Sequence, residues 1–213
     1  AIPTMGALEK LLLAKNEIYG KEGGEVIAGI LRSNTTLKEL DVSGNCGNSN
    51  TGVPFAKAAA VGLRATRTIL SMNILGNHIG NKQANELIKI LESKDSNLKT
   101  LCGFSGDETE LDLSGKGLTE GCAVLLANEV KNNGAMVTVN VMGNNIGKEQ
   151  LSKLQEMMKA HPTLVSLCGI ADDATEANLS GIKMDADDAI VLADELPAKG
   201  ALVKFDVSKN NLG

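Results

Sequence analysis

Residues 37–45 read Leu37-Lys38-Glu39-Leu40-Asp41-Val42-Ser43-Gly44-Asn45, and residues 202–210 repeat this pattern as Leu202-Val203-Lys204-Phe205-Asp206-Val207-Ser208-Lys209-Asn210. In both stretches, apolar residues recur at fixed positions before the chain reaches an asparagine. The same spacing occurs at 8–16, 69–77 and 136–144, and each of these stretches also closes on asparagine. A fixed internal repeat is typical of proteins that are built by stacking similar structural units.

The closing position occurs seven times, at 16, 45, 77, 116, 144, 182 and 210, so that successive spacings are 29, 32, 39, 28, 38 and 28. The shortest spacings define the basic unit. The two longest spacings contain similar insertions, Leu-x-x-Leu-Cys-Gly at 98–103 and 164–169, each followed by an acidic loop. The insertions occupy equivalent places in two successive pairs of repeats, which indicates duplication of a two-repeat unit.

Each unit combines a short strand with a helix. The Leu-x-Leu core has period two and predicts a half-buried strand. Apolar residues at helical spacing predict helices over 21–33, 54–66, 80–94, 119–132, 148–160 and 185–198. The Gly/Asn/Ser-rich residues 46–52 predict an extended turn, and Pro54 fits the first turn of the helix that follows. Strands stack at about 4.8 Å and helices at roughly 8–10 Å, so we expect the stack to bend into a horseshoe with its parallel sheet inside.

The pattern Leu-x-x-Leu-x-Leu-x-x-Asn, with its regular spacing and its full helix, resembles the leucine-rich repeats of the ribonuclease-inhibitor-like subclass over residues 5–213. The paired Leu-Cys-Gly insertions also resemble those of leucine-rich repeat proteins from algae and protists. The resemblance implies an α/β solenoid of about seven repeats, a single domain over 1–213, with the parallel β-sheet on the concave side and helices on the convex side. It further implies that the turn asparagines bond backbone groups in a ladder; these are Asn16, Asn45, Asn77, Asn144 and Asn210.

Two closing positions depart from this pattern, because Lys116 and Ile182 replace asparagine. Lysine has no acceptor and isoleucine has no polar group, so neither can take over the amide's hydrogen bonds. We expect these turns to be looser, or to be satisfied by Ser114 and Ser180 or by water. The last repeat stops at Gly213, before the helix that would close it, which we interpret as a fragment lacking its C-terminal helix or cap.

Composition excludes several classes of function. The net charge of −5 argues against nucleic-acid binding, and the scarcity of aromatic residues removes the stacking platforms that single strands need. The longest apolar runs fall short of the roughly 20 residues of a membrane span. We expect the four cysteines to be reduced, which favours an intracellular, cytoplasmic protein. His78 and His161 form no metal or catalytic motif with Cys, Ser or Asp, so we predict no enzymatic activity, metal or cofactor.

The candidate binding surface follows the strands. The residue between the two core apolar positions of each strand should face the concave side. It is Leu12 in the first repeat, and in the others Asp41, Asn73, Asp112, Asn140, Asn178 and Asp206. This acidic, amide-rich strip would suit a basic protein partner; alternatively, its members are ordinary solvated residues of the repeat. The acidic loops 107–110 and 172–176 lack the alternating oxygens and central glycine of a calcium loop, so we interpret them as a solvated rim.

These features favour a protein–protein interaction module. Two alternatives stay open. Some proteins of the resembled subclass stimulate small GTPases, and others form sensor segments of innate-immunity receptors; Arg32, Arg64 and Arg67 are expected in helical segments on the convex side. The chain could also be a structural subunit of a larger assembly.

Overall fold

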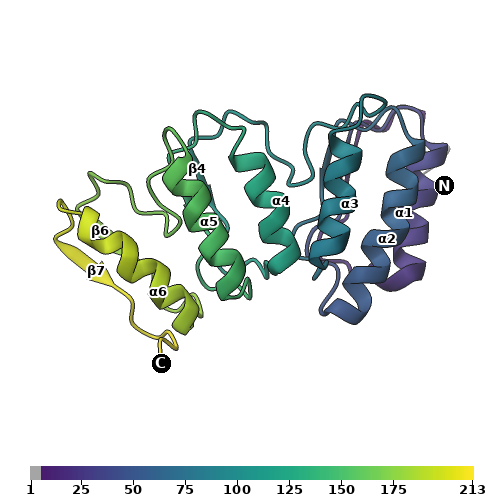
Figure 1. The fold of residues 1–213 in the computed structure, drawn as a ribbon. Coiled ribbons are helices and arrows are strands. Elements are labelled where there is room, and N and C mark those ends of the chain that lie inside the picture. Colours follow the sequence, from purple (N-terminus) through teal and green to yellow (C-terminus); the bar gives the residue numbers. More distant parts are fainter. Residues whose placement is uncertain (1–5) are drawn as a thin grey trace. The chain divides into compact units, whose positions relative to one another are not determined.

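The structure is a computed structural model that describes residues 6–213, so the predicted repeat region and domain begin just outside the described residues. Along these residues short strands alternate with helices (Figure 1). The strands are β1 (Lys10–Leu12), β2 (Glu39–Asp41), β3 (Ser71–Asn73), β4 (Glu110–Asp112), β5 (Thr138–Asn140), β6 (Glu176–Asn178) and β7 (Lys204–Asp206). The helices are α1 (Gly20–Ser33), α2 (Ser49–Ala65), α3 (Asn81–Leu91), α4 (Glu120–Val130), α5 (Lys148–Ala160) and α6 (Ala186–Glu195), and a 3₁₀ turn (Leu196–Ala198) follows α6. Every predicted helix is present, which confirms the alternating α/β reading.

The strands form three small parallel sheets, with orders β1-β2-β3, β4-β5 and β6-β7. Their register aligns the residues predicted to share a face. Asp41 pairs with Leu12 and Asn73, Asp112 pairs with Asn140, and Asn178 pairs with Asp206. The mixed α/β architecture with parallel strands is thus confirmed, but its strands are distributed over several sheets rather than one.

The Leu-Cys-Gly insertions explain where two of these sheets stop. Beside β3, the backbone of Met72 donates to the Thr100 carbonyl and that of Ile74 to the Leu101 carbonyl, each at 3.0 Å. Beside β5, the backbone of Val139 donates in the same way to the Ser166 carbonyl, at 2.9 Å. Each insertion therefore occupies the strand edge that another repeat strand would otherwise fill.

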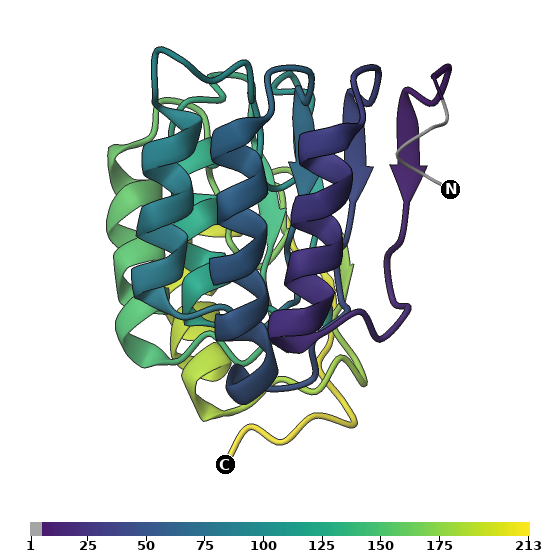
Figure 2. The same cartoon turned by 90° about the vertical axis from the view of Figure 1, so that its right-hand side faces the viewer.

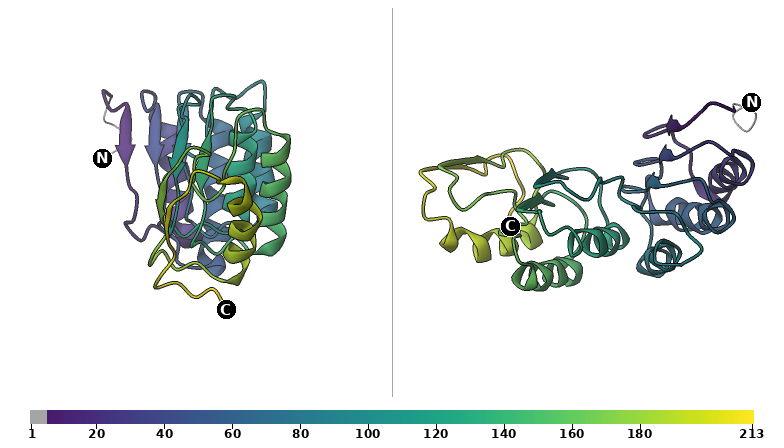
Figure 3. Two further views of the ribbon diagram at one scale, coloured as in Figure 1. Left: turned by 90° about the vertical axis from the view of Figure 1, so that its left-hand side faces the viewer. Right: turned by 90° about the horizontal axis from the view of Figure 1, so that it is seen from above.

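The chain forms two compact units that interleave in sequence. One unit ends at Ser105 and also takes in Thr119–Glu129; the other consists of Gly106–Leu118 and Val130–Gly213. In the first unit, α1, α2 and α3 lie side by side over one face of the β1–β3 sheet (Figure 2). In the second unit, α5 and α6 lie on one side of the strands, as the right-hand view of Figure 3 shows. The central residues of β2, β3 and β5, which are Leu40, Met72 and Val139, are buried in an aliphatic core, whereas those of the other four strands are partly exposed.

The turn predicted at 46–52 is wrong in its second half, because α2 already begins at Ser49. The Asn48 side chain caps this helix by accepting the backbone N–H of Thr51 at 3.2 Å. Pro54 consequently lies inside the helix rather than in its first turn. Gly52 is needed for packing: a Cβ there would lie 1.9 Å from the carbonyl oxygen of Asn77. Three helices are shorter than predicted at their C-terminal ends: α3 ends at Leu91, α4 at Val130 and α6 at Glu195.

Candidate functional site

The turn asparagines connect neighbouring repeats through both ends of their amides. Asn77 is fully buried; its Oδ1 accepts the backbone N–H groups of Asn45 and Cys46 at 2.8 and 3.1 Å, and its Nδ2 donates to the carbonyls of Val42 and Ile74. Asn45 binds the preceding turn in the same way, accepting from Asn16 at 2.7 Å. Asn16 itself is exposed, and its amide donates to the Ala14 carbonyl at 3.0 Å. The ladder that the resemblance implied is therefore present in the first unit.

The same arrangement secures the two turns that lack asparagine. Oδ1 of Asn144 accepts the Leu118 backbone N–H at 2.9 Å, just after Lys116. Oδ1 of Asn210 likewise accepts the Met184 N–H at 3.1 Å, just after Ile182. These are the bonds that Asn45 and Asn77 make to the turns before them, so the asparagine of the following repeat supports each of these turns. The contribution expected of Ser114, as one alternative to a looser turn or to water, is not seen: its hydroxyl donates to the neighbouring Asp112 carboxylate at 2.7 Å.

The six predicted face residues share one local structure. Each Asp or Asn side chain accepts the backbone N–H of the residue two positions later, which is an Asx turn that closes the strand. The acceptors are Asp41, Asn73, Asp112, Asn140, Asn178 and Asp206, with distances of 2.8, 3.2, 3.0, 3.1, 2.9 and 2.8 Å. In the last of them, the backbone N–H and hydroxyl of Ser208 hold the pKa of the Asp206 carboxyl below its ordinary value. The Asp/Asn preference therefore has a structural cause, and the second polar atom of each side chain remains available.

Three of these residues come together in the second unit, where Asp112, Asn140 and Asn178 line one pocket of about 540 Å³. Glu110 of β4 and Glu176 of β6 line it as well, and it contains no lysine or arginine. We call this the acidic strand-face pocket. Glu176 forms an ion pair with Lys204 at 3.1 Å, whereas Glu110 has no ion-pair partner among residues 6–213. The pocket thus presents uncompensated negative charge at the strand face.

The Leu-Cys-Gly insertion forms one wall of the acidic strand-face pocket. Gly169 lines the pocket with a φ of +73°, a conformation that side chains disfavour. A Cβ at this position would also lie 2.8 Å from the Cβ of Asn140. Glycine therefore allows the insertion to lie directly on β5, and Gly103 makes the equivalent approach to Asn73 in the first unit.

The strand face of the first unit is different because its charges are paired. Lys10 contacts Glu39 at 2.7 Å, and Lys38 contacts Glu9 at 2.8 Å. The Glu39 carboxylate accepts a hydrogen bond from Lys10 and raises the pKa of that ammonium group. Since each pair neutralises itself, the Asp41–Asn73 region carries less free negative charge than the pocket of the second unit.

Two glutamates anchor the insertions, one half-buried and one buried, and neither was predicted from the sequence. Glu129 accepts the Thr100 hydroxyl at 2.6 Å and the backbone N–H groups of Leu101 and Cys102. Glu195 accepts the Ser166 hydroxyl at 2.6 Å and the Leu167 N–H at 2.7 Å. The two glutamates are separated along the chain by the same offset as the two insertions. That shared offset was the signal that could have identified them.

All four cysteines are free and buried. Burial raises the pKa of Cys46 to about 11 and that of Cys102 well above its ordinary value. Since the thiolate is the reactive form, these thiols are poor nucleophiles. His161 is half-buried and has a structural role: Nδ1 accepts the Leu164 N–H at 3.0 Å and Nε2 lies 3.1 Å from the Val130 carbonyl oxygen.

Within the described part of the chain, no cluster of three His, Cys, Asp or Glu side chains is arranged to hold a metal ion. A search of the helices over residues 6–213 likewise finds none with the length and apolar character needed to cross a membrane. No protein-family model matches the sequence, and a comparison with curated proteins gives no match either.

Proposed function

We propose that this chain is a leucine-rich repeat module of the ribonuclease-inhibitor-like type that binds a basic segment of a partner protein at its strand face. The repeating strand–helix unit and the asparagine ladder support the repeat assignment. The free, buried cysteines support an intracellular location.

The acidic strand-face pocket is the observation that carries the binding proposal. It gathers carboxylates and amide groups from three strands into about 540 Å³ without a cation among its lining residues. Hydrogen bonds between a charged donor and a carboxylate contribute about 1.5–3 kcal/mol each. A lysine or arginine side chain of a partner would satisfy Glu110 and Asp112 together.

The GTPase alternative gains no support from Arg67, because its Nη1 donates to the carbonyls of Arg64 and Thr66.

Selection from an immobilised peptide library tests the proposal. The native protein should enrich peptides that contain lysine or arginine, and the selected peptides should bind in proportion to that charge. The double variant Glu110→Gln/Asp112→Asn removes both charges and keeps the Asx turn, because asparagine fills this position in β3, β5 and β6. We expect its affinity to fall by about tenfold or more, since about 1.4 kcal/mol corresponds to a factor of ten.

The matched control is Glu149→Gln/Glu156→Gln, which removes the same charge from exposed positions on α5. It should retain native affinity. If the pocket variant and the control bind the selected peptides equally well, or if selection ignores charge, the strand face is not the binding surface.

A further inference from the structure

A second pocket lies on the helical side of the first unit, where α2 and α3 end. It has a volume of about 430 Å³, in the lower part of the roughly 300–1,000 Å³ range of small-molecule sites. Leu63 and Ile90 contribute apolar surface to it. Its polar lining comes from Arg64, Arg67, Lys89, Ser93, Asp95 and Ser96. In a protein of net charge −5, three cationic side chains against one carboxylate make this a locally basic site.

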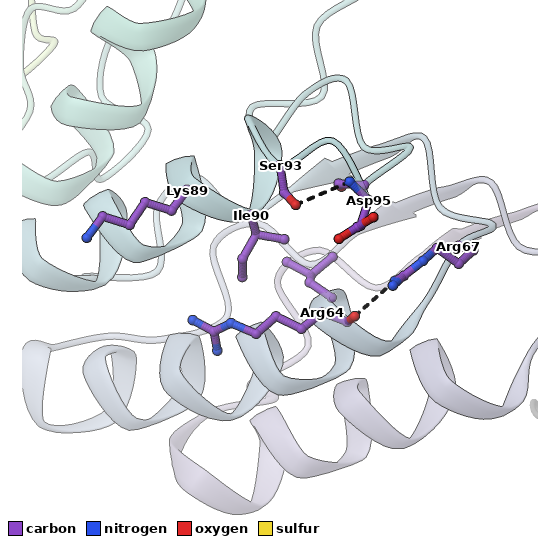
Figure 4. A pocket seen from close by; sticks show the side chains of 8 residues that line it. Arg64, Arg67, Lys89, Ile90, Ser93 and Asp95 are labelled. Atoms are coloured by element: carbon purple, nitrogen blue, oxygen red, sulfur yellow. Dashed lines mark hydrogen bonds between the residues drawn. The ribbon is translucent and has the colours of Figure 1, made fainter.

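The cations of the pocket are not all committed to structural contacts. Arg67 is partly used, because its Nη1 donates to the Arg64 and Thr66 carbonyls at 3.0 and 2.8 Å and so caps the end of α2 (Figure 4). Arg64 and Lys89 are exposed, and neither side chain has a hydrogen-bond or ion-pair partner among residues 6–213. Figure 4 shows the charged ends of both side chains on the side of Ile90 away from Ser93 and Asp95. Both residues line the pocket, and their long, unpaired side chains are free to turn into it.

The helix dipole explains only part of this grouping of cations and hydroxyl groups. Arg64 and Lys89 each lie in the last turn of a helix, where a cation complements the helix dipole by about 0.3–1 kcal/mol. That effect places one cation on each helix but gives no reason for neighbouring hydroxyl groups. Ser93 and Ser96 accept the backbone N–H groups of Asp95 and Leu98 at 3.3 and 3.2 Å. Their hydroxyl hydrogens remain free to donate, so the pocket is rich in donors.

We propose that this pocket binds a small phosphate monoester, independently of the strand-face binding described above. A guanidinium fork matches the geometry of a phosphate group, and an ammonium group adds a flexible point charge. Arg64 and Lys89 would turn toward the pocket to bind phosphate oxygens, and Ser93 and Ser96 would donate to the same group. Asp95, the one acceptor, would bind a hydroxyl or ammonium group of the organic part. The pocket therefore distinguishes a monoester with a polar body from bare phosphate.

Titrations followed by amide NMR test this with four probes: inorganic phosphate, glycerol phosphate, O-phosphoserine and a short phosphoserine peptide. We expect the monoesters to give saturable shifts at residues 63–67 and 89–96 and to bind more tightly than inorganic phosphate. Affinity should fall as salt rises, since the contacts are exposed. The relative affinities of free monoester and phosphopeptide identify the source of the ligand.

The variants Arg64→Gln and Lys89→Gln should each weaken monoester binding by about 10- to 100-fold, which corresponds to one charged hydrogen bond. Both replace exposed side chains without partners, so the fold is retained. Lys21→Gln and Lys57→Gln remove equal charge beside a separate pocket between α1 and α2 and should leave the affinity unchanged. The proposal is overturned if no monoester saturates, if inorganic phosphate binds as tightly as the monoesters, or if the two pairs of variants behave alike.

Discussion

At the scale of single residues, the buried amide of Asn77 holds two turns together. Replacing it with alanine would leave the backbone N–H groups of Asn45 and Cys46 and the carbonyl of Ile74 without their amide partner. A buried polar group that loses its partner costs about 1–3 kcal/mol. We therefore expect Asn77→Ala to lower the free energy of unfolding by at least about 2 kcal/mol in urea denaturation. Asn16→Ala, at an exposed position, should change it by no more than about 0.5 kcal/mol; equal losses would contradict a specific role for the buried amide.

The environment of Glu129 predicts how the stability of the protein depends on pH. Burial raises the pKa of its carboxyl above the ordinary value, although hydrogen bonds from Thr100 and Leu101 act in the opposite direction. The folded chain therefore holds this proton more tightly than the unfolded chain. The resulting stability is fully present below the unfolded pKa of about 4.3 and is lost as the pH rises through the higher folded pKa.

Glu129→Gln removes the titration and keeps an oxygen that can accept the backbone N–H groups. Between pH 4 and pH 8, we expect the native protein to lose stability relative to this variant when both are unfolded in urea. Glu129→Ala should be destabilised at every pH, because it leaves the insertion without its acceptor. A difference between native protein and Glu129→Gln that stays constant with pH would contradict the raised pKa.

At the scale of elements, α1 and α2 approach closely through small residues. A Cβ on Gly62 would lie 2.5 Å from the Cα of Ala28, so Gly62→Ala must push the helices apart. We expect a loss of about 1–3 kcal/mol in the free energy of unfolding. Gly29 lies in the middle of α1, where an added Cβ would meet no atom within 4 Å, and Gly29→Ala should instead gain up to about 1 kcal/mol from helix propensity. Chemical denaturation measures both, and changes of the same sign would show that close packing is not the cause.

The elements also show what the sequence could and could not predict. Apolar spacing identified every helix and the strand register, because both depend on short periodic patterns. The start of α2 was missed because Ser49-Asn50-Thr51-Gly52 has the local composition of a turn. Glycine is required at position 52 because a Cβ there would clash with the carbonyl oxygen of Asn77, a residue distant in sequence. The strand-face residues were predicted by position. Their Asx turns and the basic pocket depend on contacts that periodicity does not encode, and the only sign of the glutamate anchors in the sequence is the offset that they share with the insertions.

At the scale of the whole molecule, the units do not follow simple cuts in the sequence. Most of α4 belongs to the first unit, although residues 106–118 before it belong to the second. Two contacts within the first unit account for this. Glu129 anchors the insertion beside β3, and Gly121 lies so close to Ile79 that a Cβ would be 2.2 Å from its carbonyl oxygen. The helix is therefore part of the packing of the first unit rather than a connection to the next repeat.

This arrangement predicts how shortened chains behave. A fragment of residues 1–130 contains the first unit with its glutamate anchor and should unfold cooperatively on heating, with dispersed amide NMR signals. A fragment of residues 1–118 lacks α4 and should melt at a lower temperature or fail to fold, because Leu101 and Cys102 lose the Glu129 carboxylate that accepts both of their N–H groups. Glu129→Ala within residues 1–130 should fall between the two, since it removes the anchor and keeps the packing of Gly121. Equal thermal stability of both fragments would show that α4 is dispensable to the first unit.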